Sequence, residues 1–298
     1  MRTMAFLAMT AAFAAPPLLS PGTFVRDDEP TVGHAGPQSV PATVPSALQE
    51  PLAYTSSPVA ATTYKVADST LIAMQSPMGP MEFTTVLRAT LAVSFEADPA
   101  GFRATAEVTE FTGATGNSQT GTRSIGGSAV GGALVAVVGP AGLVELVDTP
   151  ERSREASQFT VFEELGYDLF PTMPARVVAA GDSWTDTVTS SSTSGGARTS
   201  STSIRTFTVG EVVVVEGRSL QMIGVSATVE TSTEMEQGRM AMEQSFSGTQ
   251  TGNFFWDAEA GLLRAAQLMN DFTGEAKMGR APATSVTLKR IQRIWREY

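Results

Sequence analysis

Residues 81–96 alternate between apolar and polar side chains, and this pattern constrains the fold more than any other feature of the chain. Nearly every second residue is apolar, and Thr85 is the exception on that face. A period of two over this length predicts a β-strand with one face in a core and the other in water. Residues 97–101 have the composition of a turn, and the alternation resumes over 102–109. The sequence therefore predicts a long β-hairpin.

Further strands are predicted along most of the chain. They are rich in Ser, Thr and β-branched residues, which suit a pleated sheet with one face in water. The predicted strands beyond the first hairpin are 62–66, 71–76, 133–138, 143–147, 204–209, 212–215, 219–231, 240–246, 252–256, 262–269 and 285–291. The predicted fold class is mainly β: a long, curved antiparallel sheet, or a partly open barrel or half-barrel, with one or two helices packed on it.

One segment has the signals of a helix. Thr149 can cap its start, and Pro150 suits the first helical position. Apolar residues then recur at near-helical spacing, and Gly166 is placed to end the helix. We expect an amphipathic helix over residues 150–165 that packs on one face of the sheet. Docking to a membrane or a partner is the alternative, although the acidic residues of the segment disfavour an anionic membrane surface.

The N-terminal part of the chain predicts export. Residues 1–15 have the form of a signal peptide, because Arg2 precedes a short apolar run and the small residues of a cleavage site follow at 12–14. Residues 16–60 are proline-rich without hydrophobic periodicity and predict a disordered linker. Residues 61–298 are expected to form a single β-rich domain. The expected location is periplasmic or extracellular.

Two hairpins within this domain resemble each other. Residues 132–146 and 252–265 each contain a hairpin closed by Ala-Gly-Leu. One interpretation is that the domain has two similar halves, 61–148 and 177–298, joined by the helix at 150–165. The other is that two ordinary hairpins share a turn sequence by coincidence.

Charge and missing residue types exclude several classes of site. Acidic residues outnumber basic ones by 30 to 20, and the net charge of −10 disfavours binding to nucleic acid. The chain has no cysteine, and its one histidine, His34, lies in the proline-rich segment. We therefore expect no catalytic residue, no metal site and no cofactor. No apolar run reaches the roughly 20 residues of a membrane-spanning helix, so a membrane-spanning protein is not expected.

Two motifs follow the predicted helix. The first reads Leu-Phe-Pro-Thr-Met-Pro at 169–174 and the second Val-Val-Ala-Ala-Gly-Asp-Ser-Trp at 177–184, with Gly-Asn-Phe-Phe-Trp-Asp later at 252–257. In these motifs the chain resembles a family of exported bacterial proteins of unknown function, which carry a Pro…Val-x-x-Gly-Asp-Ser-Trp segment ahead of a β meander. The resemblance implies an exported β-rich fold from about residue 61 and no catalytic residue. Many such relatives are lipoproteins, but this chain lacks the cysteine that lipidation needs.

The one-sided sheet suggests a binding function, because its apolar face must be buried against something. Where the helix and loops leave that face uncovered, an apolar groove results that suits a lipid, another apolar or amphiphilic small molecule, or an envelope protein. The residues predicted to line this groove are Phe83, Leu87, Leu91, Phe95, Phe102 and Trp184. The leading hypothesis is a non-catalytic protein of the cell envelope.

Two alternative functions are compatible with the sequence. One is a structural or adhesive surface domain held on the proline-rich linker. The other is a glycoside hydrolase that uses Asp182 and Asp186, which share one face of a strand with Trp184. A turn role for Asp182 and a core role for Trp184 explain the same residues without catalysis.

A basic segment near the C-terminus contains Lys289, Arg290, Arg293 and Arg296. We expect these side chains to be solvated, with Trp295 packed among them, and a role in binding an anionic group or a partner is the alternative.

Overall fold

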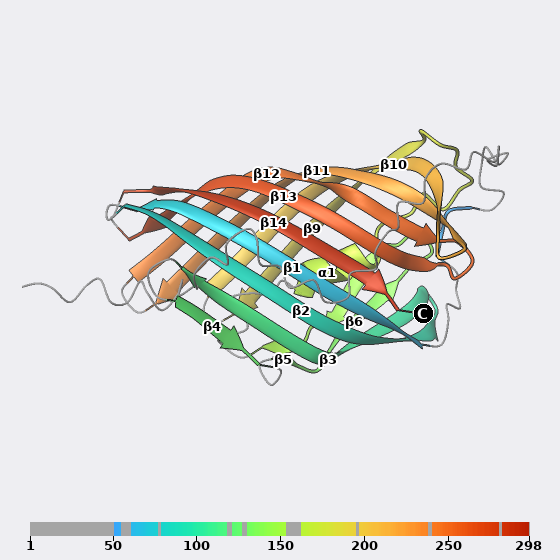
Figure 1. The fold of residues 1–298 in the computed structure, drawn as a ribbon, viewed down its shortest axis with the longest axis horizontal. Coiled ribbons are helices and arrows are strands. Elements are labelled where there is room, and N and C mark those ends of the chain that lie inside the picture. Colours follow the sequence, from blue (N-terminus) through green and yellow to red (C-terminus); the bar gives the residue numbers. More distant parts are fainter. Residues whose placement is uncertain are drawn as a thin grey trace, which may run out of the picture.

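The computed structural model shows a mainly β protein whose one large sheet curls into a half-barrel (Figure 1). It describes residues 51–54, 61–76, 79–117, 121–126, 130–152, 162–194, 197–237, 240–279 and 282–297. The fold class predicted from the sequence is confirmed. The predicted signal peptide and residues 16–50 of the predicted linker lie outside the described residues and stay predictions.

The described secondary structure consists of many strands and one helix. The first half of the chain contributes β1 (Ala61–Ser76), β2 (Gly79–Asp98), β3 (Gly101–Asn117), β4 (Gly121–Ile125), β5 (Val130–Gly131), β6 (Ala133–Val138), β7 (Val144–Asp148) and β8 (Glu151–Arg152). The helix α1 (Phe162–Leu169) follows. The second half contributes β9 (Ser183–Ser194), β10 (Ala197–Val215), β11 (Arg218–Gln237), β12 (Met240–Asp257), β13 (Leu262–Met278) and β14 (Thr284–Arg296).

All neighbouring strands of the large sheet are antiparallel, and the first and last strands meet in its middle. The order is β7-β6-β3-β2-β1-β14-β13-β12-β11-β10-β9, with β4 paired to β3 beside this path. Strands β7 and β9 are therefore the two edges. The chain passes from one edge to the other through α1, which contacts β6, β7 and β9. The helix thus lies on the side of the half-barrel that the sheet leaves open.

The predicted hairpin of residues 81–109 is confirmed as β2 and β3, which turn at Pro99 and Ala100. Three breaks predicted within strands are wrong, and one of them, between residues 246 and 252, lies inside β12. Residues 61–76 form one strand, because Asp68 faces inward and is neutralised there instead of marking a turn. Residues 197–215 also form one strand, with a bulge between Val209 and Val212.

The predicted helix over residues 150–165 is wrong in position. Glu151 and Arg152 form β8, and the helix runs from Phe162 to Leu169. Gly166 does not end the helix. It lies inside α1, where an added Cβ would come within 2.8 Å of the Leu146 side chain, so glycine permits the close approach of α1 to β7. Residues 153–161 lie outside the described part of the chain.

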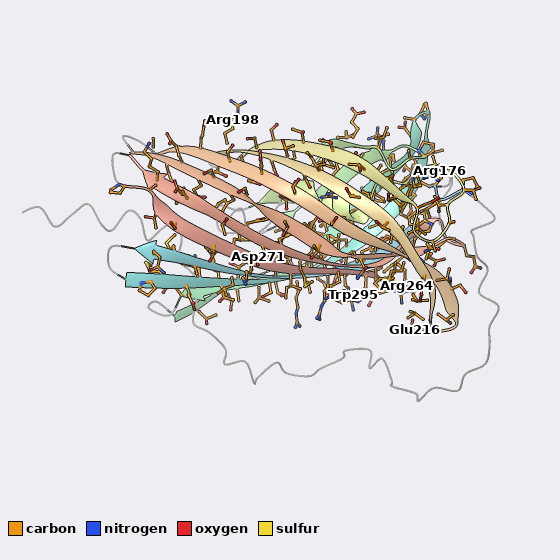
Figure 2. The ribbon with its side chains drawn as sticks, turned by 90° about the horizontal axis from the view of Figure 1, so that it is seen from above. Arg176, Arg198, Glu216, Arg264, Asp271 and Trp295 are labelled. Atoms are coloured by element: carbon orange, nitrogen blue, oxygen red, sulfur yellow. The ribbon has the colours of Figure 1, made fainter. Side chains whose placement is uncertain are left out.

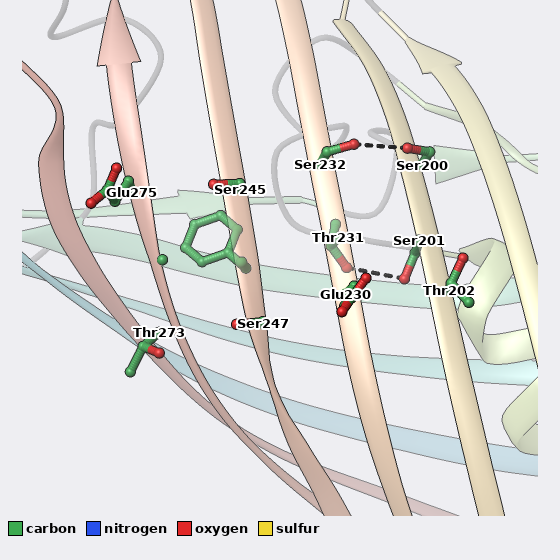
Figure 3. A pocket seen from close by; sticks show the side chains of 12 residues that line it. Ser200, Ser201, Thr202, Glu230, Thr231, Ser232, Ser245, Ser247, Thr273 and Glu275 are labelled. Atoms are coloured by element: carbon green, nitrogen blue, oxygen red, sulfur yellow. Dashed lines mark hydrogen bonds between the residues drawn. The ribbon is translucent and has the colours of Figure 1, made fainter.

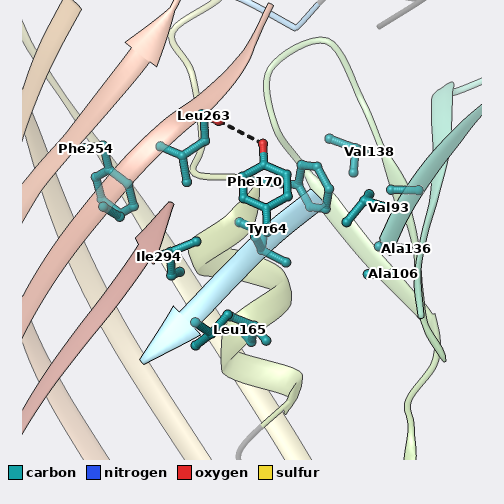
Figure 4. Packing of buried hydrophobic residues seen from close by; sticks show 14 of the residues in the cluster. Tyr64, Val93, Ala106, Ala136, Val138, Leu165, Phe170, Phe254, Leu263 and Ile294 are labelled. Carbon is teal, nitrogen blue, oxygen red and sulfur yellow. Dashed lines mark hydrogen bonds between the residues drawn. The ribbon is translucent and has the colours of Figure 1, made fainter. Parts of the chain in front are cut away.

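The core fills one end of the half-barrel, which we call the packed end, where β2 turns into β3 and β12 turns into β13. Its rings meet mostly edge to face, as Tyr54 and Trp256 do with centroids 4.9 Å apart. The Tyr64 hydroxyl donates to the Leu263 carbonyl at 2.8 Å (Figure 4). The largest fully buried side chains include Trp256, Tyr64, Phe102, Phe207 and Phe254.

The linker predicted over 16–60 ends earlier than expected. Leu52 and Tyr54 are buried in the core, and the Tyr54 hydroxyl donates to the Pro171 carbonyl at 2.9 Å. Leu52 also pairs through its backbone with Arg176. Residues 51–54 therefore belong to the folded domain, because their apolar side chains close the packed end.

The outer side of the sheet is mostly polar, with exposed apolar residues such as Met269, Ile291 and Trp295 among the polar ones. Along β2 the outward residues include Glu82, Arg88 and Glu96, all exposed. Figure 2 shows the side chains of Arg198, Asp271 and Trp295 on this outer side. The alternation predicted from the sequence thus separates a buried inner face from a hydrated outer face.

Glycines on the inner face let β12 and β13 approach closely toward the end opposite the packed end, which we call the far end. A Cβ at Gly274 would lie 1.9 Å from the Ser245 carbonyl oxygen, and one at Gly248 would lie 2.1 Å from that of Asp271. Phe246 pairs with Gly274 across the two strands, and Phe272 pairs with Gly248. An aromatic ring beside each glycine is a common way to stabilise a strongly bent sheet.

We expect Gly274→Ala to destabilise the protein by at least about 1–3 kcal/mol, because β12 and β13 must separate to admit the methyl group. Gly126→Ala is the control, since nothing lies within 4 Å of that position. Urea unfolding of both variants measures the difference. Equal stability of the two variants would show that the close approach at Gly274 does not constrain the sheet.

Candidate functional site

The predicted groove residues lie in the packed interior. Leu87, Leu91 and Phe102 belong to the main core cluster, and Phe95 and Trp184 pack against it. Phe83 is the exception, because it lies at the far end in a separate cluster with Met74 and Val286. Leu91 and Phe102 are each 1% exposed, so the apolar face is filled by protein at this end. The predicted role of the six residues as ligand contacts stays a prediction.

Trp184 anchors the segment that follows the helix. Its indole Nε1 donates to the Thr172 carbonyl at 2.9 Å, and its ring stacks on Phe207 with centroids 5.3 Å apart. The core role inferred from the sequence is therefore confirmed.

The two candidate carboxylates of a hydrolase have local partners. Asp182 accepts hydrogen bonds from the Ala179 N–H at 3.2 Å and from Arg176 at 3.0 Å, which lowers the pKa of its carboxyl group. Asp186 accepts a hydrogen bond from the Thr172 hydroxyl at 2.6 Å. These contacts show that Asp182 is a turn residue and that Asp186 anchors the loop at Thr172. The hydrolytic role of the pair stays a prediction that none of the contacts requires.

A group of charged side chains beneath α1 forms the most distinctive polar site of the inner face. Arg290 on β14 donates through Nε to Asp68 at 2.6 Å and through Nη1 to Glu164 at 2.8 Å. Asp68 lies on β1 and Glu164 on α1. Arg290 therefore connects the first strand, the last strand and the helix. We call Asp68, Glu164, Asp168, Arg205 and Arg290 the ion-pair cluster.

The other two members of the ion-pair cluster, Arg205 and Asp168, hold the C-terminal end of the helix. Arg205 on β10 lies 3.1 Å from the Asp168 carboxylate and donates to the Tyr167 carbonyl at 3.4 Å. Asp168 follows Glu164 by four residues, so both carboxylates share one face of α1. The helix thus lies against the inner face through two arginines from β14 and β10, which are four positions apart in the sheet.

Burial and charge act in opposite directions on the cluster. Burial raises the pKa of Asp168, although the nearby Arg205 guanidinium lowers it in part. Burial alone would lower the pKa of Arg290, but Asp68 and Glu164 outweigh it and the pKa is raised overall. Arg290 is therefore always charged, whereas Asp168 is the carboxyl group whose ionisation is disfavoured.

The expectation that the basic side chains of the C-terminal segment are solvated is wrong for Arg290 and Arg296. Alternation along β14 turns Arg290 and Arg296 inward, where Arg296 pairs with Asp257. Lys289 points outward and lies 3.6 Å from Asp271. Trp295 is 37% exposed, so the prediction of a packed Trp295 is wrong. Strand parity could have separated the buried arginines from the solvated ones.

A small cavity, here called the polar pocket, lies beside the ion-pair cluster. It has a volume of about 30 Å³ and is lined by residues of α1, β9, β10, β11, β12 and β13. Five of its buried side chains have an atom without a hydrogen-bond partner: Asp168 Oδ1, Ser203 Oγ, Arg205 Nε, Gln250 Oε1 and Asn270 Oδ1. Buried polar atoms are nearly always paired, so this concentration is a signal of a binding site. Sequence reasoning missed it, although polar residues at inward parity would have marked it.

A larger hollow of about 410 Å³ spans β10 to β13 on the outer side of the sheet near the far end (Figure 3). Its lining is mostly hydroxyl-bearing, with Phe246 as the aromatic exception and Glu230 and Glu275 as the charged residues. Ser201 contributes to both the hollow and the polar pocket, but the hollow lies on the outer face and the pocket on the inner face, so the sheet separates them. The Ser201 and Thr231 hydroxyls lie 3.0 Å apart and hydrogen-bond to each other.

The described residues contain no group of three His, Cys, Asp or Glu side chains placed to hold a metal ion. Within the same part of the chain, no helix is long and apolar enough to span a bilayer.

Comparisons with known proteins give no family for this chain. No protein-family model matches it. No curated protein matches it either. Among solved structures, it is similar to OccK7 (OpdD) of Pseudomonas aeruginosa at 7% sequence identity, over 80% of this chain and 99% of that one, with a TM-score of 0.23. A TM-score of that size carries no argument about fold or function.

We expect Asp168 to make the stability of the protein depend on pH. Its pKa is raised in the fold, so the native state favours the protonated form, and stability is lost as pH rises from about 4 through the folded pKa. Asp168→Asn should remove this pH-dependent loss of stability, even where the substitution also changes stability by an amount that does not depend on pH. Urea unfolding between pH 4 and 7 measures it.

Asp182→Asn is the control with the opposite sign. The pKa of Asp182 is lowered in the fold, so its contribution is present above about pH 4 and is lost as pH falls through the folded pKa. Profiles of wild type and Asp168→Asn that run parallel between pH 4 and 7 would contradict the assignment of Asp168.

Arg290→Gln should destabilise the protein by about 3–5 kcal/mol, because it leaves Asp68 and Glu164 without their cation in a largely buried site. Lys289→Gln, at the next position of β14, removes only an exposed pair with Asp271 and should change stability by less than about 1 kcal/mol. Chemical denaturation compares the two. Equal effects would show that the ion-pair cluster does not hold the helix.

Proposed function

We propose that this protein is a non-catalytic protein of the cell envelope that binds an amphiphilic molecule in the far half of its half-barrel. The observation that carries the proposal is that, on one inner face, the polar pocket lined by Ser203, Gln250 and Asn270 is followed toward the far end by the apolar cluster of Phe246 with Met74, Phe83 and Val286. Concave sites with a few placed polar groups and an apolar wall are typical of ligand binding.

The apolar side of this site is supported by the packing around Phe246. That ring packs on the inner face against the cluster of Met74, Phe83 and Val286. On the same inner face, Ser201 and Thr231 present hydroxyl groups that hydrogen-bond to each other. An amphiphile can therefore meet aromatic and polar surface within one site.

The absence of catalysis is argued from the engagement of the charged groups. Both arginines of the ion-pair cluster face carboxylates, and Asp182 and Asp186 are bound by neighbouring residues. Location in the envelope, periplasmic or extracellular, is argued from the predicted signal peptide of residues 1–15 and from the charged outer face of the sheet, which suits water rather than hydrocarbon.

A structural or adhesive role is the second candidate, and the edge strand β9 favours it. Among the described strands β9 pairs only with β10, and its twelve residues contain one charged side chain, Asp186. An edge with so few charges can pair with another chain. A concentration-dependent dimer in light scattering that Thr189→Pro abolishes would favour this role over ligand binding.

Native mass spectrometry of the purified full chain, with solvent extraction of bound lipid, tests the proposed function. We expect a bound amphiphile of stoichiometric amount, because the inner face offers both kinds of surface. Phe246→Ser should reduce its occupancy, whereas Met269→Ser on the outer face of β13 should not. Clean apo-protein that also binds no added amphiphile would refute the proposal.

A further inference from the structure

We infer that the polar pocket receives the primary ammonium group of an amphiphile whose tail lies along an apolar row of the inner face. This inference rests on the proposed function and adds the chemical class of the head group. Four features carry it: the unpartnered atoms of the pocket, its size, its charge and the apolar side chains that continue from it.

The unpartnered atoms of the pocket are mainly hydrogen-bond acceptors. The five side chains that carry them are 2–7% exposed, and they are Asp168, Ser203, Arg205, Gln250 and Asn270. Three of the atoms are carboxylate or amide oxygens, which only accept, and the Ser203 hydroxyl can accept as well. Unpaired polar atoms at this depth destabilise the fold, so a group with several N–H donors is the partner that the pocket lacks among the described residues.

The size of the pocket limits the head group. A water molecule needs a cavity of at least about 10–15 Å³, and an ammonium group is close to water in size. The pocket of about 30 Å³ therefore holds one ammonium group and at most one water. Such a water can accept a hydrogen bond from the Arg205 Nε–H, the one nitrogen among the five unpartnered atoms. A phosphate or a trimethylammonium group is too large.

The charges around the pocket favour a cation. Within the ion-pair cluster three carboxylates face two guanidiniums, so one negative charge is in excess. Arg205 pairs with Asp168, whereas Arg290 alone faces both Asp68 and Glu164. Glu164 and Asp168 also line the pocket. A buried charge without a balancing partner destabilises the fold, and an ammonium group in the pocket supplies the missing positive charge.

An apolar row leads from the pocket across four strands of the inner face. Phe272 on β13 lines the pocket and pairs in register with Leu288 on β14. Leu288 pairs with Ile72 on β1, and Ile72 pairs with Phe83 on β2. The first three of these side chains are half-buried, and Ile72 packs against the apolar cluster that contains Phe83. A tail along this row contacts apolar side chains while its head group stays in the polar pocket.

Three molecules with the same tail test the inference: octylammonium, octyltrimethylammonium and octanol, each below its micelle concentration or solubility limit. Octyltrimethylammonium has the same charge but no N–H group, and octanol has no charge. Titration calorimetry with the full chain at pH 7 measures their affinities. We expect octylammonium to bind at least about tenfold more tightly than either of the others, because only its head group both donates to several acceptors and balances the charge of the pocket.

Variants of the pocket locate the head group. Asp168→Asn removes a charge at nearly constant size, and Asn270→Leu removes an amide. Each should weaken octylammonium binding by about tenfold, with a smaller effect on octanol. Asp271→Asn and Gln267→Leu, both on the outer face of β13, are the matched controls and should bind as wild type. Circular dichroism confirms that each variant is folded before titration.

A variant of the apolar row locates the tail. Leu288→Ser should weaken the binding of octylammonium and of octanol by a similar factor, because both molecules have the same tail. Ile291→Ser changes an exposed residue on the outer face of the same strand and should leave both affinities unchanged.

Each contrary outcome contradicts a definite claim. Equal affinities for octylammonium and octyltrimethylammonium would show that the acidic protein attracts any cation. Unchanged octylammonium binding by both pocket variants would show that the pocket holds ordered water only. Either result, or an unchanged affinity of Leu288→Ser, would overturn the inference while the proposed function stands. Failure of all three molecules to bind, together with apo-protein in native mass spectrometry, would overturn the proposed function as well.

Discussion

The pairing of Arg290 with Asp68 and Glu164 is the interaction on which the rest of the inner face depends. A sheet with one buried face excludes charge from that face unless every charge finds a partner there. Arg290 meets this condition by contacting a carboxylate on β1 and one on α1. Because β1, β14 and α1 are far apart in the sequence, their ion pairs also fix where the helix crosses the open side.

This arrangement divides the interior into zones of different chemistry. Leu52, Tyr54 and Trp256 fill the packed end. The ion-pair cluster and the polar pocket follow beneath the helix, and the smaller apolar cluster of Met74, Phe83 and Val286 lies at the far end. The inner face therefore changes from apolar to polar and back to apolar along the half-barrel.

The period-two pattern of the sequence was sufficient to predict the sheet but not the polar site on its inner face. Alternation in β2 and β3 predicted the long hairpin because burial of one face alone determines it. The same alternation could not show that Asp68 continues a strand, since its stability there comes from Arg290, a residue 222 positions away. The helix was misplaced because the cap signals at Thr149 and Pro150 are local, whereas tertiary contacts with Arg205, Arg290 and Leu146 determine where α1 lies.

The inner-face site was missed for a related reason. Gln250 and Asn270 look like ordinary polar residues in Ser/Thr-rich strands, and only their parity assigns them to the buried side. Leu52 and Tyr54 were similarly assigned to a linker because prolines surround them, although they close the core. Whether these residues are buried depends on contacts with residues that are distant in the sequence. The sequence alone does not reveal those contacts.

The seam between β1 and β14 has a consequence for biosynthesis. These strands pair antiparallel over Tyr64–Met74 and Val286–Arg296, in the middle of the sheet. During translation, the edge of β1 that pairs with β14 therefore stays unpaired until the last strand has been synthesised. Loss of the C-terminal strand would therefore leave β1 and β13 unpaired in the middle of the sheet and not at one of its edges. Because β1 stays unpaired until synthesis ends, this topology suits export before folding.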